Sequence, residues 1–348
     1  MRVICQLPTN DWSRVARRAK AAEAAGYDGV ATSELAHDPF MPLAIASQAT
    51  ERVQLGTSIA VAFPRSPMIA ANIGWDLHAE SGGRFELGLG SQVKGHNERR
   101  FSTPWVAPVP RLREYVQSIR AIWRCWEKGE PLKFEGEHYQ FTLMTPEFSP
   151  SPTGRPLPPI TLAAVGPDML RMSGRVADGV RLHGFCTRKY IENVCMPRIE
   201  EGMAKSGRKR EALEISGGGF IATGPDEAAV QEKLDWARYR VGFYGSTRTY
   251  LPVFEQHGLE DLGLKLHRMS VEGKWKDLAS QVSDDVVRLF AAVGDYDALP
   301  EAAAERFGGV VDTLRLDLPD DIDPDLHRDL VAKLKAIPGR FEAFDTAA

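Results

Sequence analysis

Cysteine is scarce in this chain and shows no informative spacing. The four cysteines among 348 residues are Cys5, Cys125, Cys186 and Cys195. No two of them form a C-x-x-C pair or a zinc-type spacing, and the sequence contains no recognisable cluster of metal ligands. We therefore expect buried, reduced thiols, as in a cytoplasmic protein, and neither a disulfide framework nor a metal site.

Long apolar runs and an excess of basic charge are also missing. No stretch of 18 apolar residues occurs, so no membrane span is expected. The opening residues, MRVICQLPTN, lead directly into a strand and lack the apolar core of a signal peptide. The net charge is −4 and the basic residues are scattered, which argues against nucleic-acid binding. These features predict a cytoplasmic protein that binds neither a membrane nor nucleic acid.

Strand and helix patterns alternate along most of the chain. Helical spacing separates the strand-like segments, and no hairpin signal joins neighbouring ones until residue 132, so a parallel sheet or barrel is expected. Helices are expected at 11–25, 40–50, 67–81, 108–128, 167–176, 188–206 and 324–337. Strands are expected at 2–7, 27–32, 53–62, 84–89, 160–165, 179–182, 213–221 and 310–316. Eight strands in this rhythm predict an α/β fold, a single (β/α)8 TIM barrel over residues 1–348.

Two insertions interrupt the alternation. The first, around 104–159, consists of the amphipathic helix 108–128, a β-hairpin at 132–144 and a proline-rich run. The second, around 225–308, is predominantly helical, with an aromatic, glycine-broken loop at 239–246. Loops of such length inside a compact domain are usually functional or poorly ordered. We expect substrate-pocket walls from 93–108, 146–158 and 240–250.

Glycine turns at two strand ends are the first candidates for a binding site. Hydrolase signals such as G-x-S-x-G or a spaced Cys/His pair are absent. Gly88-x-Gly90 follows one strand, and Gly166-Pro167 stands between another strand and a helix. In parallel α/β folds both turns lie at the ligand-binding end, and a helix N-terminus favours anions. Together the turns suggest a phosphorylated cofactor, although close packing of helix on strand explains such glycines equally well.

Several longer segments resemble one enzyme superfamily. They are TSELAHDPF, LGTSI, PRSPMIAA, SGGRFELGLGSQVKGHNERRF and AAVGPDMLRMSGRVADGV. Together they are similar to the bacterial luciferase-like superfamily, and within it to the oxidoreductases that depend on the deazaflavin coenzyme F420. The resemblance covers most of residues 1–185 and, more thinly, 285–337. It implies a (β/α)8 barrel with an insertion before the fifth strand, and hydride transfer between coenzyme F420 and a small organic substrate.

The resemblance also implies roles for individual residues. A non-prolyl cis peptide bond is expected at Ser58–Ile59, behind the cofactor ring. Glu34 corresponds to an acidic residue near the ring. Gly90, Ser91, Gln92 and Asn97 would contact the ring and the side chain of the cofactor. Val165, Gly166, Asp168 and Met169 would form the turn that binds its phosphate.

The chain departs from the sugar-phosphate dehydrogenases of that superfamily. Leu35 occupies the position of their catalytic histidine, and their catalytic glutamate is unmatched, so that activity is not expected. His37 and His183 follow strands and are alternative proton donors, unless each merely hydrogen-bonds a loop backbone. Arg99 and its neighbour Arg100 suit a carboxylate or phosphate of the cofactor, and equally an ordinary surface ion pair.

Three alternatives stay open on the sequence alone. The chain can be an F420-dependent oxidoreductase, an FMN-dependent monooxygenase on the same scaffold, or a cofactor-binding relative without turnover. The substrate is a small molecule whose identity cannot be inferred. The resemblance implies a homodimer formed through the second and third helices, where Trp75 and Leu77 face either a partner or the barrel.

Overall fold

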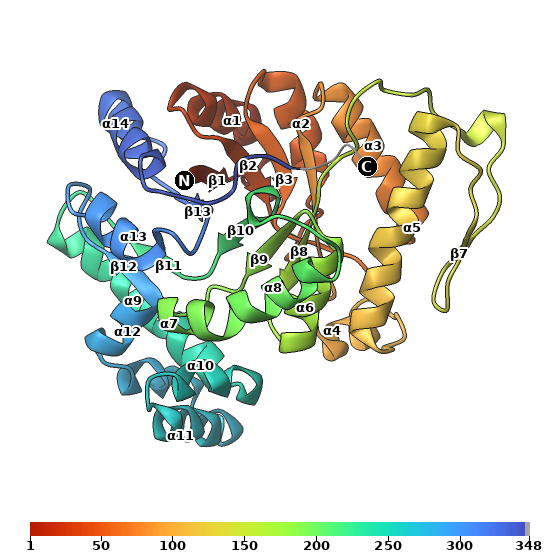
Figure 1. Ribbon diagram of the computed structural model, residues 1–348. Coiled ribbons are helices and arrows are strands. Elements are labelled where there is room, and N and C mark those ends of the chain that lie inside the picture. Colours follow the sequence, from red (N-terminus) through yellow and green to blue (C-terminus); the bar gives the residue numbers. More distant parts are fainter. Residues whose placement is uncertain (345–348) are drawn as a thin grey trace.

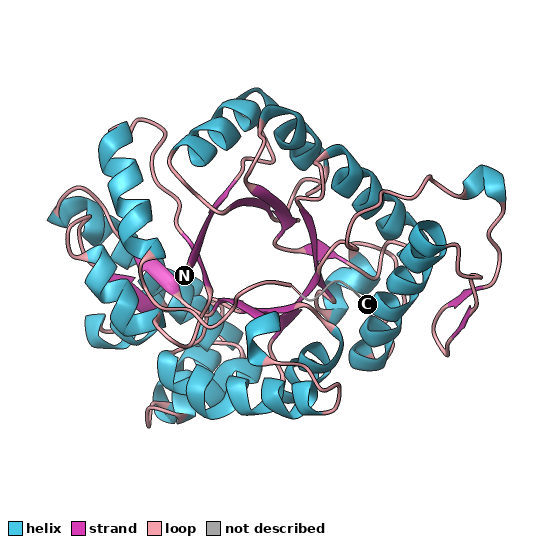
Figure 2. Ribbon diagram, turned by 45° about the horizontal axis from the view of Figure 1, so that its top comes forward, coloured by secondary structure: helices cyan, strands magenta, loops and turns pink. Residues whose placement is uncertain are grey.

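A closed parallel barrel forms the centre of the molecule. The computed structural model describes residues 1–344, and the strand order is β3-β2-β1-β13-β10-β9-β8-β5-β4, with β3 also paired to β5. Because β3 and β4 are two pieces of one interrupted strand, this order closes an eight-stranded ring, seen in Figure 2. The strands are β1 (Arg2–Gln6), β2 (Gly29–Thr32), β3 (Gln54–Thr57), β4 (Ala60–Val61), β5 (Phe85–Gly90), β8 (Ile160–Ala164), β9 (Gly179–Leu182), β10 (Glu214–Gly217) and β13 (Thr313–Arg315). The predicted (β/α)8 TIM barrel is confirmed.

Helices cover the outside of the barrel (Figure 1). Local signals set their ends: the Asp11 side chain accepts a hydrogen bond from the Ser13 amide at 3.1 Å, and Gly26 takes φ +87° after the first helix. The short 3-10 helix Trp12–Arg14 leads into that helix. The barrel helices are α1 (Val15–Ala24), α2 (Met41–Ala49), α3 (Pro67–Glu80), α6 (Pro167–Val176), α7 (Arg188–Tyr190), α8 (Met196–Ala204), α13 (Leu299–Phe307) and α14 (Pro324–Lys335), with a π-helix at Ile191–Cys195 between α7 and α8.

The third barrel strand is broken where the sequence pattern places its bulge. The Ser58–Ile59 peptide bond between β3 and β4 is cis, as the resemblance implied. Gly88 of β5 lies directly beside the break, and a Cβ atom there would overlap the carbonyl oxygen of Thr57. Glycine is therefore required at this point by the close approach of two backbones.

The first insertion has the predicted helix and hairpin. Helix α5 (Pro108–Lys128) is followed by the antiparallel pair β6 (Phe134–Glu135) and β7 (Gln140–Phe141). In Figure 1 this hairpin extends beyond α5, away from the barrel. No helix is expected from the sequence between β5 and α5, but this segment contains the short helix α4 (Lys94–Arg99).

Helix α3 packs on α5 through Trp75. Trp75 is buried and meets Trp126 of α5 edge to face, with ring centroids 5.4 Å apart. Leu77 is also buried, so both residues belong to the core of this chain. Ile69, near the start of the same helix, is 51% exposed.

The second insertion is less uniformly helical than expected. The predicted strand 213–221 ends early, because Gly217 and Gly218 take φ near +80° and turn the chain away from the barrel. The next segment, β11 (Phe220–Ala222), pairs instead with β12 (Ala291–Val293) in a small parallel sheet. Between these strands lie α9 (Glu227–Gly245), α10 (Leu251–Glu255), α11 (Glu260–Val271) and α12 (Asp284–Phe290), with short 3-10 turns.

The predicted aromatic loop at 239–246 is wrong, since α9 runs almost to its end. Gly242 and Gly245 do not break this helix. A Cβ at Gly242 would lie 3.1 Å from the backbone of Leu278, and one at Gly245 would lie 2.7 Å from the Phe254 ring. Both glycines permit close packing against neighbouring segments.

Paired charges fill part of the barrel interior. Arg181 forms an ion pair with Glu86, and its Nε donates to the Thr161 hydroxyl at 2.9 Å. Arg2 forms an ion pair with Glu214, whose pKa is raised by burial. Buried charges are tolerated in proteins when each has such partners.

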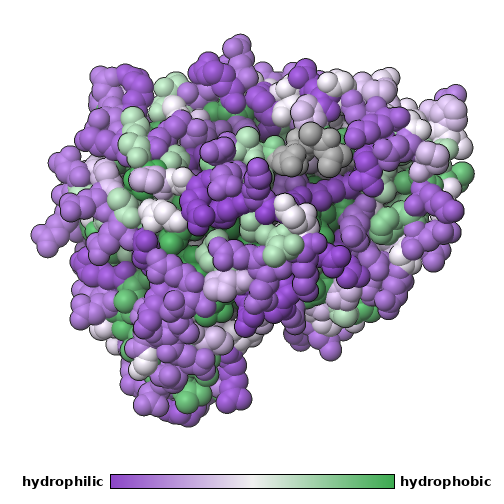
Figure 3. All heavy atoms as spheres, viewed as in Figure 1, coloured by the Kyte–Doolittle hydropathy of each residue, from purple (hydrophilic) through white to green (hydrophobic). Residues whose placement is uncertain are grey.

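One face of the molecule is mostly hydrophilic (Figure 3). Figure 3 shows polar residues over most of one face, interrupted by small hydrophobic areas. Among the helices of residues 1–344, none combines the length and the apolar character that a membrane crossing requires.

Candidate active site

The interrupted third strand is held by the end of β2. The Ser58 amide donates to the Thr32 carbonyl at 2.6 Å, and the Ser33 hydroxyl donates to the Ser58 carbonyl at 2.7 Å. The Glu34 amide donates to the Ile59 carbonyl at 3.1 Å. The polar backbone groups around the break are therefore paired, and the position of Ile59 is fixed from the strand beside it.

The Glu34 carboxylate braces the same strand. Its Oε2 accepts hydrogen bonds from the Val61 amide and from Nη1 of Arg65, each at 2.7 Å, and the side chain is only 8% exposed. Arg65 also contacts Asp38 at 3.2 Å and lies over the Phe40 ring. A carboxylate engaged in this way is suited to positioning the backbone, and its catalytic role remains a prediction.

Ile59 and small residues form an apolar floor at the mouth of the barrel. A Cβ added to Gly90 would lie 2.8 Å from Cδ1 of Ile59 and 3.4 Å from Cβ of Ala163, so these three residues of neighbouring strands converge. Ile59 and Ala163 are only partly buried. A flat group resting here would meet carbon atoms and no charge.

Asn97 organises the loop after β5. Its side chain is fully buried, and Nδ2 donates to the carbonyls of Ser91 and Val93 at 2.9 and 3.1 Å. Its Oδ1 has no hydrogen-bond partner within residues 1–344. Gln92 takes φ +55°, and its Oε1 accepts from the Val93 amide at 2.9 Å. Ser91 and Gln92 thus present their backbone in a fixed turn beside the floor.

The two arginines of α4 have different surroundings. Arg99 is exposed at the surface. The adjacent Arg100 is also exposed, but it donates to the Leu35 carbonyl and lies over the Phe101 ring. Arg100 therefore links the loops after β2 and β5, while the predicted cofactor contact of Arg99 stays a prediction.

The N-terminus of α6 offers backbone donors and open space. Gly166 is its N-cap residue, and no atom lies within 4 Å of the position that a Cβ would occupy there. First-turn amides of a helix have no partner within the helix and favour an anion. Asp168 is exposed and paired with Arg171 at 2.6 Å, Met169 is buried, and Val165 is half-buried. A phosphate at this turn would be bound by backbone N–H groups.

His183 lies in an aromatic cluster after β9. Its ring centroid is 4.4 Å from that of Tyr244 and 5.0 Å from that of Tyr250. Nδ1 accepts a hydrogen bond from the Phe185 amide at 3.0 Å, so the ring proton lies on Nε2. Burial, aided by the charge of Arg240, lowers the pKa of His183 to about 4. At neutral pH the ring is uncharged and offers one N–H donor. The other predicted histidine, His37, is exposed in the loop after β2.

The profile of the luciferase-like monooxygenase family matches residues 3–313. The chain belongs to this family. A protein of Mycobacterium tuberculosis described as uncharacterised is 46% identical over 303 residues, which cover 87% of this chain and 89% of that one. A putative coenzyme F420-dependent oxidoreductase of the same species is 29% identical over 80% of this chain and 82% of its own.

Solved structures agree on the fold. The coenzyme F420 dependent tetrahydromethanopterin reductase from Methanopyrus kandleri superposes with a TM-score of 0.76 at 20% identity. The match covers 97% of this chain and 98% of the reductase. The predicted membership of the luciferase-like superfamily is thus confirmed.

Some residues at the mouth of the barrel were not predicted from the sequence. Arg65, which pairs with Glu34, follows a proline turn with no recognisable motif. Tyr244 and Tyr250 lie in the segment 240–250 that was expected to form a pocket wall, but neither residue was singled out. Within the first insertion the fold also gathers Glu114, Glu137 and His138, although the sequence shows no metal-ligand spacing.

A separate cavity of about 280 Å³ lies outside the barrel wall. It is lined by residues of β1, α1 and the start of α14, among them Cys5, Tyr27 and His327. Since Arg2 of β1 points into the barrel toward Glu214, the alternate residue Cys5 points outward toward the helices. The cavity is therefore distinct from the mouth, where the strand-end loops gather.

Proposed function

We propose that this protein is an oxidoreductase that transfers a hydride between coenzyme F420 and a small organic substrate at the mouth of the barrel. Family membership and the F420-dependent relatives support the reaction class. The observation that carries the proposal is the pairing of an apolar floor at Ile59 with the open first turn of α6 at Gly166. A cofactor with a flat ring and a phosphate needs both features.

The residues present fit such a group. When bound, F420 supplies two-electron hydride chemistry, and the protein has to orient and shield it. Ile59 supports the ring, and Gly90 leaves room for the Ile59 side chain. Asn97 fixes the turn of Ser91 and Gln92, and its buried Oδ1 is available as an acceptor.

The other side of the mouth positions the substrate. The neutral His183 ring offers its Nε2–H to a carbonyl or hydroxyl oxygen, and the rings of Tyr244 and Tyr250 surround it. Because its pKa is near 4, His183 acts near neutral pH as a hydrogen-bond donor and does not carry a stored proton. Glu34 keeps the opposite strand in place through Arg65 and Val61.

An FMN-dependent monooxygenase is the second candidate, because the family profile bears the name of that activity. Titration of the purified protein with F420 and with FMN, followed by ring fluorescence, distinguishes the two. We expect saturable F420 binding that is weakened at least tenfold by Gly166→Val. Micromolar FMN binding without F420 binding would reverse the assignment. Absence of binding for both cofactors would contradict the proposal, whereas F420 binding without hydride transfer would favour a cofactor-binding relative without turnover.

We also propose a homodimer formed through α2 and α3. Met41 of α2 and Ile69 of α3 are 56% and 51% exposed, although both are large and apolar. Sedimentation velocity at micromolar concentration tests this. A dimer that dissociates in Ile69→Glu supports the interface, whereas a wild-type monomer contradicts it.

A further inference from the structure

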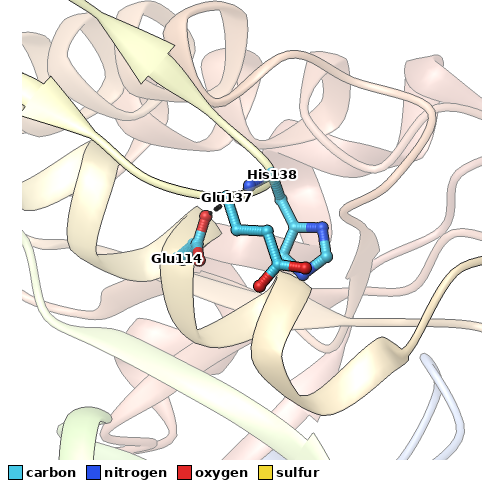
Figure 4. Close-up of side chains that lie close together, drawn as sticks. All are labelled: Glu114, Glu137 and His138. Atoms are coloured by element: carbon cyan, nitrogen blue, oxygen red, sulfur yellow. Dashed lines mark hydrogen bonds between the residues drawn. The ribbon is translucent and has the colours of Figure 1, made fainter.

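Three potential metal ligands lie close together in the first insertion. None of them has a role in the site proposed at the mouth. Glu114 belongs to α5, while Glu137 and His138 occupy the turn between β6 and β7. Their donor atoms all lie within 4.8 Å of one another. Figure 4 shows Glu114 projecting toward the turn, and the Glu137 carboxylate beside the His138 ring.

The Glu114 carboxyl group is buried and has no cationic partner among residues 1–344. The residue is 7% exposed, and its Oε2 accepts a hydrogen bond from the His138 amide at 2.7 Å. Within residues 1–344 no lysine, arginine or histidine side chain lies within ion-pair distance of this carboxylate. Arg111, one turn earlier, is directed to the Tyr139 hydroxyl at 3.0 Å and to a backbone carbonyl. A buried carboxylate is costly unless a cation or several donors compensate it.

His138 supplies a second, independent sign. Its Nε2 is buried and has no hydrogen-bond partner in the described part of the chain. Buried polar atoms are nearly always paired with protein, water or an ion. Gly136 belongs to the same arrangement, because a Cβ there would overlap the Glu114 carboxylate. The hairpin turn is thus shaped to bring an imidazole nitrogen and a buried carboxylate together.

We propose that Glu114, Glu137 and His138 bind one divalent transition-metal ion, best represented by Zn²⁺. One nitrogen and two carboxylate ligands suit Zn²⁺, whereas Mg²⁺ and Ca²⁺ prefer oxygen ligands alone. The ligand atoms have to approach one another until each lies about 2 Å from the ion. Exposed Glu137 moves freely enough to do this, and water completes the coordination.

The ion would fasten the hairpin to α5. The paired strands β6 and β7 are only two residues each, so their own hydrogen bonds hold the hairpin weakly. The other contacts between the hairpin and the helix include the Tyr139 ring against Tyr115, at 5.6 Å, and the Arg111 hydrogen bond. The hydrogen bond from the His138 amide to Glu114 already joins the turn to the helix, and a metal ion between Glu114 and the turn would strengthen this attachment.

Calorimetric titration of the metal-free full-length protein with ZnCl₂ tests the site. We expect one Zn²⁺ bound per chain, with affinity reduced at least about tenfold in His138→Gln and in Glu114→Gln. Glu135→Gln removes an exposed carboxylate from the same hairpin and should leave the affinity within about twofold. Equal affinity in wild type and both ligand variants overturns the proposal, as does absence of one-to-one binding at about 100 µM Zn²⁺.

Limited proteolysis adds a readout specific to the hairpin. Zn²⁺ should slow cleavage within residues 132–144 in wild type and in Glu135→Gln, and leave it unchanged in His138→Gln. In Glu114→Gln the side-chain amide oxygen can still accept the His138 N–H, so that variant is expected to fold, as circular dichroism will show. If Zn²⁺ slows cleavage neither in the wild type nor in any variant, Glu114 serves only to hold the turn.

Discussion

The two sides of the barrel mouth are built in different ways. On one side, residues Ser33, Glu34, Ser58, Arg65 and Asn97 form what we term the hydrogen-bonded wall, in which side chains hold backbone groups of neighbouring loops. On the other side, His183, Phe185, Tyr244 and Tyr250 form the aromatic wall, held by ring packing.

The difference separates two tasks. The hydrogen-bonded wall fixes where Ile59 and the 91–97 turn lie, so it suits a cofactor that must be oriented. The aromatic wall excludes water and keeps His183 neutral, so it suits a substrate that needs a donor but no charge. Four substitutions test this contrast, in order of decreasing effect.

The largest effect is expected beneath the hydrogen-bonded wall, for Gly88→Ala. The added Cβ would overlap the Thr57 carbonyl oxygen, and neither backbone can move without breaking the pairing of β3 with β5. We expect a loss of more than about 3 kcal/mol in the free energy of unfolding, or no folded protein. Urea denaturation followed by circular dichroism measures it. A free energy of unfolding within about 1 kcal/mol of wild type would show that the strands have room to separate.

The next largest effect is expected for Glu34, whose carboxylate accepts hydrogen bonds from Val61 and Arg65 in this wall. Glu34→Ala removes the buried carboxylate that pairs with Arg65 and accepts from the Val61 amide, which should cost about 3 kcal/mol of stability. Asp38→Asn is the matched control. It removes a half-exposed carboxylate from the same arginine and should cost less than about 1 kcal/mol. Equal losses in urea denaturation would mean that the Glu34 pair is no more than a surface ion pair.

A pH dependence should identify the aromatic wall. His183 has an ordinary pKa near 6.5 when unfolded and about 4 when folded, so the unfolded chain takes up the proton first. The stability that depends on neutral His183 is therefore present above about pH 6.5 and is lost as pH falls toward 4. Between pH 7 and 5, protonation of this residue in the unfolded chain should lower the free energy of unfolding by about 2 kcal/mol.

The His183→Phe variant keeps a ring against Tyr244 and Tyr250 but has no titrating group. Between pH 7 and 5, its free energy of unfolding in urea denaturation should fall by about 2 kcal/mol less than that of wild type. Tyr250→Phe retains His183 and should keep the wild-type pH dependence. Identical pH profiles for wild type and His183→Phe would contradict a buried, neutral His183.

The smallest effect on stability is expected for Gly166→Ala, between the two walls. The φ of −80° suits alanine and no atom lies within 4 Å of the new Cβ, so stability should change by less than about 1 kcal/mol. If the cofactor phosphate lies here, F420 affinity should fall about tenfold, or 1.4 kcal/mol. Fluorescence titration measures this affinity. An unchanged affinity would remove Gly166 from the binding site.

Local patterns in the sequence were sufficient for much of the fold. Alternating strands and helices predicted the barrel, and the expected helices 11–25 and 67–81 agree with the observed ones to within a few residues. These signals depend on periodicity and turn chemistry within a few residues. They failed where glycine serves packing, as in α9, because Gly242 and Gly245 read as helix breakers until their neighbours are known.

The sequence by itself determined the barrel and the family, and it predicted the loops at which we propose the site. The tertiary structure alone decided how the residues in those loops are used. It paired Glu34 with Arg65 across 31 positions, made His183 neutral by burial, and brought Glu114 beside His138. The physical reason is that pairing and burial depend on contacts between residues far apart in the chain. Such contacts are set by strand register and helix packing, which no local pattern encodes.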